Sequence, residues 1–323
     1  GYDSIPATSQ VAALVMKPQR EEDVQDREIK QALVSRGYSE AITYSFTHPD
    51  WIKAFNDISP LMLTSPISPE LSAMRTTLLP ALCEAAKYNL NRQQKRVRLF
   101  EQGLRYIKDE HAENGVRQDP MVAGVAAGER YDETWGIRQH GVDFFDMKGD
   151  VEQLLSVTAD PEAFEFRRTT ERALHPGQGA DIYKDGVKVG FVGMLHPIAM
   201  KQLGLKGKVG VFEIERQAIA SRAIPAYKPL SKVPSVRRDF AFLISTDVSG
   251  ADLLGVVRGK AGALLEDMWT ELFLDDEDFL TAELEELIGH LTDYRNALRA
   301  KDTQRLHDLL KEGRELKATA GGN

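Results

Sequence analysis

The segment from residue 71 to residue 103 constrains the fold more than any other, because a helix pattern in it is followed at once by a strand pattern. From Thr77 to Leu90 the apolar residues recur at the spacing of one helix face. Pro80 falls in the first turn, where its missing N–H costs nothing. Residues 97–100 then alternate with period two, which predicts a strand that stops at Gly103. The segment therefore predicts a helix packed on a sheet.

The rest of the chain mixes helix and strand patterns. Helices are predicted at residues 18–36, 49–55 and 143–157, strands at 41–46, 121–126 and 209–214, a polar loop at 108–119 and a tight hairpin at Asp185-Gly186. The motif at residues 175–179 is interpreted as a tight turn, and His196 as the start of a helix. Strands outnumber helices, which indicates an α+β fold with an antiparallel sheet and flanking helices.

Composition limits the class of protein. The chain has 323 residues, 42% of them hydrophobic and 28% charged, which is ordinary for a soluble protein of about two domains. Cys83 is the only cysteine, so no disulfide framework exists and a cytoplasmic setting is expected. No segment has the pattern of a membrane span or a signal peptide. The histidines are scattered, which predicts no metal site.

Charge is distributed unevenly along the chain. Residues 271–323 carry 13 acidic and 7 basic side chains, a net charge of −6, whereas residues 1–270 carry 36 and 34, a net charge of −2. A nearly neutral body gives no overall electrostatic attraction for nucleic acid. Any contact with RNA must therefore be local.

Several motifs, taken in order, carry a resemblance to a known family. They are GYDSIP at residues 1–6, RGYSEAITYSF at 36–46, MRTTLLP at 74–80, YNLNRQ at 88–93, RLFEQG at 98–103, FFDMKGDVEQLL at 144–155, HPGQGA at 175–180, GMLHP at 193–197 and PSVRRDFAF at 234–242. Each is weak alone, but their order and spacing resemble the C-terminal part of the bacterial phenylalanine-tRNA ligase beta subunit. The resemblance covers residues 1–269.

The resemblance implies a synthetase-like fold without catalytic activity. It divides the chain into a remnant of a preceding domain (1–17) and a core shaped like a class II aminoacyl-tRNA synthetase (18–226). A working class II site needs arginines to hold the ATP phosphates. Arg98 and Glu101 offer only a superficial match, and residues 209–215 form no Gly-rich strand ending in arginine. No catalytic residue is therefore expected.

The resemblance also implies a partner. In the family this module packs against the alpha subunit, which holds the phenylalanine and ATP site, in an alpha-2 beta-2 complex that charges tRNA(Phe). The chain itself is expected to bind no cofactor, with ATP and magnesium used at the level of the holoenzyme. An arginine and asparagine rim beside an apolar helix face has the composition of an interface edge. The predicted contact residues are Met74, Arg75, Tyr88, Asn89, Asn91 and Arg92.

Residues 227–270 resemble the first half of the family's ferredoxin-like anticodon-binding domain. A strand at 240–244, a helix at 251–257 and the start of a second strand at 264–269 are expected. Arg237 and Arg238 are the predicted tRNA contacts. An ion pair with a neighbouring carboxylate is an equally good interpretation of both.

Residues 271–323 carry a heptad pattern of leucines, which predicts a helical hairpin able to self-associate. This α-helical tail weakly resembles the C-terminal dimerising helices of prephenate dehydrogenase, so a chimeric chain is one explanation. A stand-alone RNA-binding or self-associating module remains the main alternative. An oxidoreductase is disfavoured because the sequence has no strand-linked G-x-G-x-x-G motif.

Overall fold

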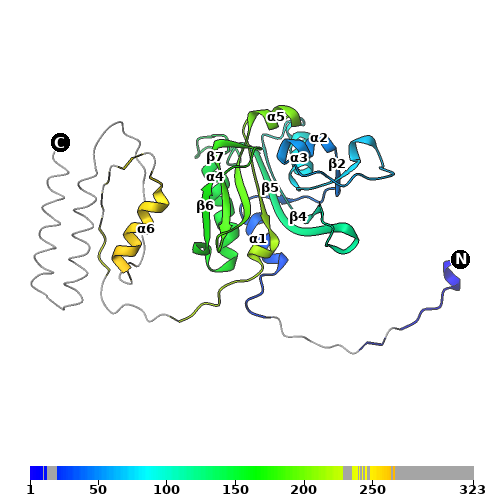
Figure 1. Cartoon of the computed structure of the whole chain (residues 1–323), viewed down its shortest axis with the longest axis horizontal. Coiled ribbons are helices and arrows are strands. Elements are labelled where there is room, and N and C mark those ends of the chain that lie inside the picture. Colours follow the sequence, from blue (N-terminus) through cyan, green and yellow to red (C-terminus); the bar gives the residue numbers. More distant parts are fainter. Residues whose placement is uncertain are drawn as a thin grey trace, which may run out of the picture. The chain divides into compact units, whose positions relative to one another are not determined.

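The structure is a computed structural model. It describes residues 1–9, 11–12, 20–227, 235–238, 240, 242, 244–245, 248–262 and 265. The chain divides into two units, residues 1–228 and 229–323 (Figure 1). The candidate site lies in the first unit.

A seven-stranded sheet forms the centre of the first unit. Its strands, in spatial order, are β1 (Ser39–Glu40), β4 (Arg96–Lys108), β5 (Val116–Gly128), β9 (Val209–Glu215), β8 (Val187–Leu195), β7 (Leu174–Lys184) and β6 (Phe164–Arg168). Every neighbouring pair is antiparallel except β1 and β4, which are parallel. A second, two-stranded sheet pairs β2 (Phe46–Thr47) with β3 (Ala73–Met74). This confirms the predicted α+β fold with a mostly antiparallel sheet.

Helices cover both faces of the large sheet. They are α1 (Asp26–Ser35), α2 (Pro49–Phe55), α3 (Leu79–Leu90), α4 (Phe144–Leu155) and α5 (Pro197–Leu203). Helices α1 and α4 share one buried cluster with Phe100 and Phe212, whereas α2, α3 and α5 lie together over the other face (Figure 1). Side chains along β5 alternate between the clusters, with Val122 in the first and Ala123 in the second.

Strands β4 and β5 extend beyond their predicted ends. The predicted stop at Gly103 is wrong, because β4 continues to Lys108, and the predicted loop at 108–119 is wrong from Val116 onward, where β5 begins. The two strands pair without interruption from Arg96 opposite Gly128 to Lys108 opposite Val116. Backbone pairing thus continues where the apolar alternation ends.

Three smaller predictions also need correction. The helix predicted from residue 18 begins at Asp26, because Gln25 caps it by donating its N–H to the Glu28 carboxylate at 2.8 Å. The strand predicted at 41–46 is wrong except at Phe46, where β2 begins, because residues 41–45 lie between β1 and β2 and belong to neither. Residues 175–179 are not a tight turn. They belong to β7, where the pairing with β8 is irregular.

Other predictions are confirmed. Asp143 caps α4 by accepting the Asp146 N–H at 2.9 Å. Asp185 and Gly186 both have positive φ in the turn between β7 and β8. His196 accepts the Ile198 N–H at the start of α5. Cys83 is buried within α3, and burial raises the pKa of its thiol to about 12.

In the second unit the structure describes helix α6 (Gly250–Ala261), which contains the helix predicted at 251–257. Of the predicted strand at 240–244, residues 240, 242 and 244 are described and lie outside any strand. The strand predicted at 264–269, apart from Leu265, and the helical tail at 271–323 lie outside the described residues. No helix in the described part of the chain is long and apolar enough to cross a membrane.

Candidate functional site

A buried ion pair joins the turn before α3 to strand β4. Arg75 follows β3, and its Nη1 donates to Glu101 Oε1 at 2.8 Å and to Thr43 Oγ1 at 3.0 Å. Its Nε donates to the Leu104 carbonyl oxygen at 2.8 Å. Arg75 and Glu101 are only 3% and 4% exposed. The guanidinium lies against Gly103, where a Cβ atom would come within 2.4 Å of Nη2 and would displace it.

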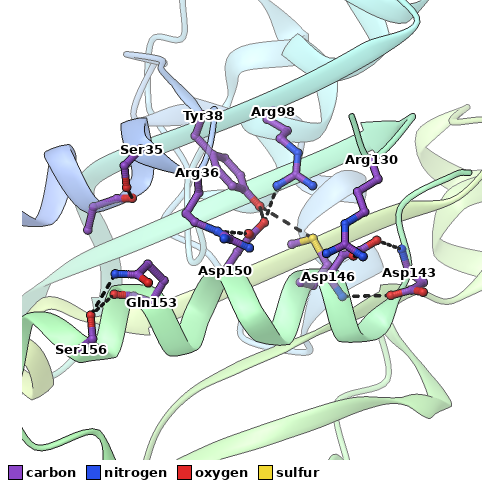
Figure 2. Close-up of polar contacts among 12 residues, drawn as sticks. Ser35, Arg36, Tyr38, Arg98, Arg130, Asp143, Asp146, Asp150, Gln153 and Ser156 are labelled. Carbon is purple, nitrogen blue, oxygen red and sulfur yellow. Dashed lines mark hydrogen bonds and ion pairs between the residues drawn. The ribbon is translucent and has the colours of Figure 1, made fainter. Parts of the chain in front are cut away.

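A second buried group lies on the opposite face of the sheet, between β4 and α4 (Figure 2). Arg98 on β4 is paired with Asp150 on α4. Asp150 also accepts from Arg36 Nε at 2.7 Å and from the Tyr38 hydroxyl at 2.9 Å. Burial raises the pKa of Tyr38 well above its ordinary value, and the Asp150 carboxylate adds to the rise. The Tyr38 hydroxyl therefore stays neutral and donates.

One turn earlier on α4, Asp146 forms a related ion pair. Arg130, which follows β5, places Nη1 2.6 Å from Asp146 Oδ1 (Figure 2). The Asp146 side chain is almost fully buried, whereas Arg130 is about one-third exposed. The spacing of four residues puts Asp146 and Asp150 on one side of the helix, where they face Arg130 and Arg98.

Glu213 supplies a third buried carboxylate, on the central strand β9. It accepts from Thr77 Oγ1 at 3.0 Å and from the Leu78 N–H at 2.8 Å, at the start of α3. Burial raises the pKa of the Glu213 carboxyl above its ordinary value of 4.5, although the Leu78 hydrogen bond opposes the rise. The carboxylate therefore fixes the beginning of α3 on the sheet.

The raised pKa of Glu213 predicts a pH-dependent loss of stability. Between the unfolded and folded pKa values the folded chain keeps a proton that the unfolded chain releases, so this group's contribution to stability falls as pH rises above 4.5. Glutamine keeps an acceptor but cannot ionise. The stability of Glu213→Gln relative to the native chain, measured by urea unfolding, is therefore expected to increase with pH from 4.5 upward.

The matched control is Glu84→Gln, because Glu84 is an exposed carboxylate on α3. This variant is expected to follow the pH profile of the native chain. A stability difference between Glu213→Gln and the native chain that stays constant with pH would contradict the assignment.

These contacts give the buried arginines of β4 and of the turn before α3 internal partners, and the absence of a catalytic residue stays a prediction. Arg98 and Glu101, the superficial match to a synthetase motif, lie on opposite faces of β4, and each is paired with a different partner. Both are less than a tenth exposed. Arginines committed to internal carboxylates cannot also hold phosphate oxygens. Among the described residues no cluster of His, Cys, Asp and Glu could hold a metal ion, and the absence of a metal stays a prediction.

The predicted interface residues separate into two groups at the two ends of α3. Met74, half-buried, and Arg75, buried, precede the helix. At its C-terminal end, Tyr88 is 55% exposed, and the Arg92 guanidinium lies 3.2 Å from the centre of the Tyr88 ring. Asn89 is half-buried and Asn91 is exposed. Arg75 is therefore buried in this chain, and the interface role of all six residues stays a prediction.

Four exposed apolar side chains lie in the segments that precede β2 and β3, and sequence reasoning missed them. They flank the small sheet of β2 and β3: Ile42, Tyr44, Met62 and Ile67 are 91%, 66%, 57% and 76% exposed. We call these four residues the apolar patch. Met62 forms a bridge with Ala73 on β3, and Ile42 and Tyr44 flank Thr43, which contacts Arg75. Their alternation favoured a half-buried strand, so the sequence carried no signal of exposure.

Arg237 and Arg238, the predicted tRNA contacts, lie in the second unit and are exposed. Asp239 and Glu266 are the carboxylates considered as their alternative ion-pair partners, and both lie outside the described residues. Both arginines stay predictions.

Comparison with known proteins supports the resemblance seen in the sequence. The domain described as the phenylalanyl tRNA synthetase beta chain CLM domain matches residues 5–216. This chain therefore belongs to the phenylalanyl-tRNA synthetase beta chain family. Beta subunits of phenylalanine–tRNA ligase from Vibrio cholerae and Aliivibrio fischeri are both 46% identical to it, over 268 and 266 residues. The Yersinia pestis beta subunit is 44% identical over 264 residues.

The matches cover 83%, 82% and 81% of this chain but only 34%, 34% and 33% of those three beta subunits. The chain thus spans about a third of the length of the curated relatives it matches. Among solved structures, a pyrrolysyl-tRNA synthetase from Desulfitobacterium hafniense is similar over 60% of this chain and 64% of that one. Its TM-score of 0.44 and identity of 12% are too low to define the fold.

Proposed function

We propose that this chain is the synthetase-like part of a phenylalanine–tRNA ligase beta subunit and acts as a scaffold for a catalytic alpha subunit. The proposal includes an alpha-2 beta-2 assembly in the cytoplasm that attaches phenylalanine to tRNA(Phe). ATP and magnesium are used by the alpha subunit, and this chain binds neither. Family membership supports the role, and so does the 46% identity to beta subunits.

One observation carries the non-catalytic half of this proposal. Arg75 and Arg98 are buried and ion-paired with Glu101 and Asp150. Adenylate formation needs cations that are free to stabilise charge developing on phosphate. These arginines instead hold α3 and α4 on the sheet, so their role is structural, as expected for a scaffold. The core is accordingly proposed to have a class II synthetase-like shape without the chemistry.

The proposed contact with the alpha subunit combines the apolar patch with the exposed end of α3. Exposed apolar side chains in a cluster are typical of interfaces. The neighbouring Met74 continues the patch, and Tyr88, Asn89, Asn91 and Arg92 form a polar edge at the far end of α3. Tyrosine and arginine are also the residues most enriched in interface hot spots.

Co-purification with a tagged alpha subunit tests this contact. The double variant Ile42→Asp, Tyr44→Asp is expected to abolish co-purification, because it would bury two carboxylates at the centre of the interface. Tyr88→Ala is expected to weaken it, since this residue lies at the edge. Val187→Asp is the matched control, because Val187 is 64% exposed at the start of β8, in neither group.

A double variant that co-purifies as well as the native chain would refute the contact. Loss of co-purification in the Val187→Asp control would show that the effect is not local.

A further inference from the structure

A cavity of about 480 Å³ opens at the end of the large sheet, away from the buried ion pairs. It lies between β7, the end of β8, helix α5 and the loop at 204–208. Its lining residues are His175, Gln178, Met194, Leu195, Pro197, Met200, Lys201, Leu205, Lys206, Gly207, Lys208 and Val209. We call this site the lysine pocket. Its volume is within the range of small-ligand sites.

The polar lining of the lysine pocket consists mainly of hydrogen-bond donors. Lys201, Lys206 and Lys208 are exposed and have no ion-pair partner among the described residues. His175 Nδ1 accepts the Gly177 N–H at 3.2 Å, so its Nε2 carries the proton of the neutral ring and is a donor. No carboxylate is among the lining residues. This set of groups favours an anion.

The loop that carries two of these lysines is held in place by the body of the unit. Lys87 on α3 donates from Nζ to the Leu203 carbonyl oxygen at 3.0 Å, and Leu205 is buried. Gly204 and Gly207 both have positive φ, a backbone conformation that favours glycine. The lysines are thus presented from a fixed backbone.

Much of the lining of the lysine pocket is apolar, and one ring, that of His175, is part of it. Met194, Leu195 and Val209 are buried, and Met200 is half-buried. A flat apolar body can rest on this surface while its anionic group reaches the lysines at the rim.

We propose that the lysine pocket binds one nucleotide of single-stranded RNA. The phosphate is held by Lys201, Lys206 and Lys208, and the base packs against His175 and the methionines. Single-stranded RNA is favoured over an acidic peptide because each nucleotide carries both a phosphate and a flat base, joined by the ribose, and the pocket offers lysines beside an apolar lining. A base in a duplex could not enter the cavity. The inference rests on the proposed function, in which the assembly handles tRNA.

The test is fluorescence anisotropy of a short, labelled, single-stranded RNA with the full chain. The triple variant Lys201→Gln, Lys206→Gln, Lys208→Gln is expected to bind about 10-fold more weakly and with a shallower salt dependence. The matched control is Lys108→Gln, Arg138→Gln, Arg168→Gln, which removes the same charge from exposed positions elsewhere. It is expected to bind within about 2-fold of the native chain.

A second variant tests the base. His175→Ala is expected to weaken RNA binding about 5-fold while leaving the salt dependence unchanged, because stacking is lost and no lysine is removed. Equal weakening by the two triple variants would overturn the proposal, since net charge alone would explain it. Unchanged RNA binding by the triple lysine variant would also overturn the proposal. The same holds if the native chain binds poly-glutamate more tightly than RNA and the triple lysine variant loses that binding.

Association with the alpha subunit is measured on the same variants. A lysine variant that still associates with the alpha subunit but no longer binds RNA supports the pocket. A native chain that does not associate with the alpha subunit counts against the scaffold role instead. The two proposals therefore fail separately.

Discussion

Replacing Asp150 with alanine is expected to lower the free energy of unfolding by about 3–5 kcal/mol, because it leaves the Arg98 guanidinium buried without its counter-charge. Arg98 is 7% exposed, and its Nε already has no hydrogen-bond partner. We therefore expect no other acceptor to replace the Asp150 carboxylate. The Tyr38 hydroxyl also loses its acceptor. Urea unfolding of the purified chain, followed by circular dichroism, measures the change.

The control for Asp150 lies on the same helix. Glu152 is paired with Lys148 at the surface, and its side chain is 49% exposed. Glu152→Ala is expected to cost less than about 1 kcal/mol, because exposed ion pairs contribute little. Equal losses in the two variants would show that α4 is sensitive to any substitution and that the buried pair has no special role.

Breaking the other buried pair is expected to be as costly. Arg75→Met leaves Glu101 buried and should lower the free energy of unfolding by about 3–5 kcal/mol. Adding Glu101→Leu should recover most of this loss, because two apolar side chains can replace a buried pair at little net cost. The Gly103 backbone beside Arg75 leaves room for the unbranched methionine.

A double-mutant cycle separates the pair from other effects. The exposed pair Arg167 and Glu165, half or more exposed, serves as the reference, and Arg167→Met should cost less than about 1 kcal/mol. If the double variant at 75 and 101 were no more stable than Arg75→Met alone, the loss would reflect packing and not an unpaired charge.

The elements that sequence reasoning predicted well are those whose determinants are local. Helix α4 carries its own cap at Asp143 and a helical apolar pattern, and the Asp185-Gly186 turn needs only two residues. Cys83 falls on the apolar face of its helix. Such features are fixed within a few residues of chain.

The features that escaped prediction depend on residues far apart in the chain. Arg75 was expected at the surface, as charged residues usually are, and its burial requires Glu101 on a strand of the sheet. The outer halves of β4 and β5 lack apolar alternation, so only their mutual pairing reveals them. The lysine pocket is lined by residues of β7, α5 and the following loop, so no single segment of the sequence predicts it.

The scaffold role is tested most directly by light scattering of this chain mixed with the alpha subunit of a bacterial phenylalanine–tRNA ligase. A complex with the summed mass of both subunits, or a multiple of it, is the predicted result. Two separate species that keep their individual masses at micromolar concentration would contradict the account, because the exposed apolar patch would then have no partner there.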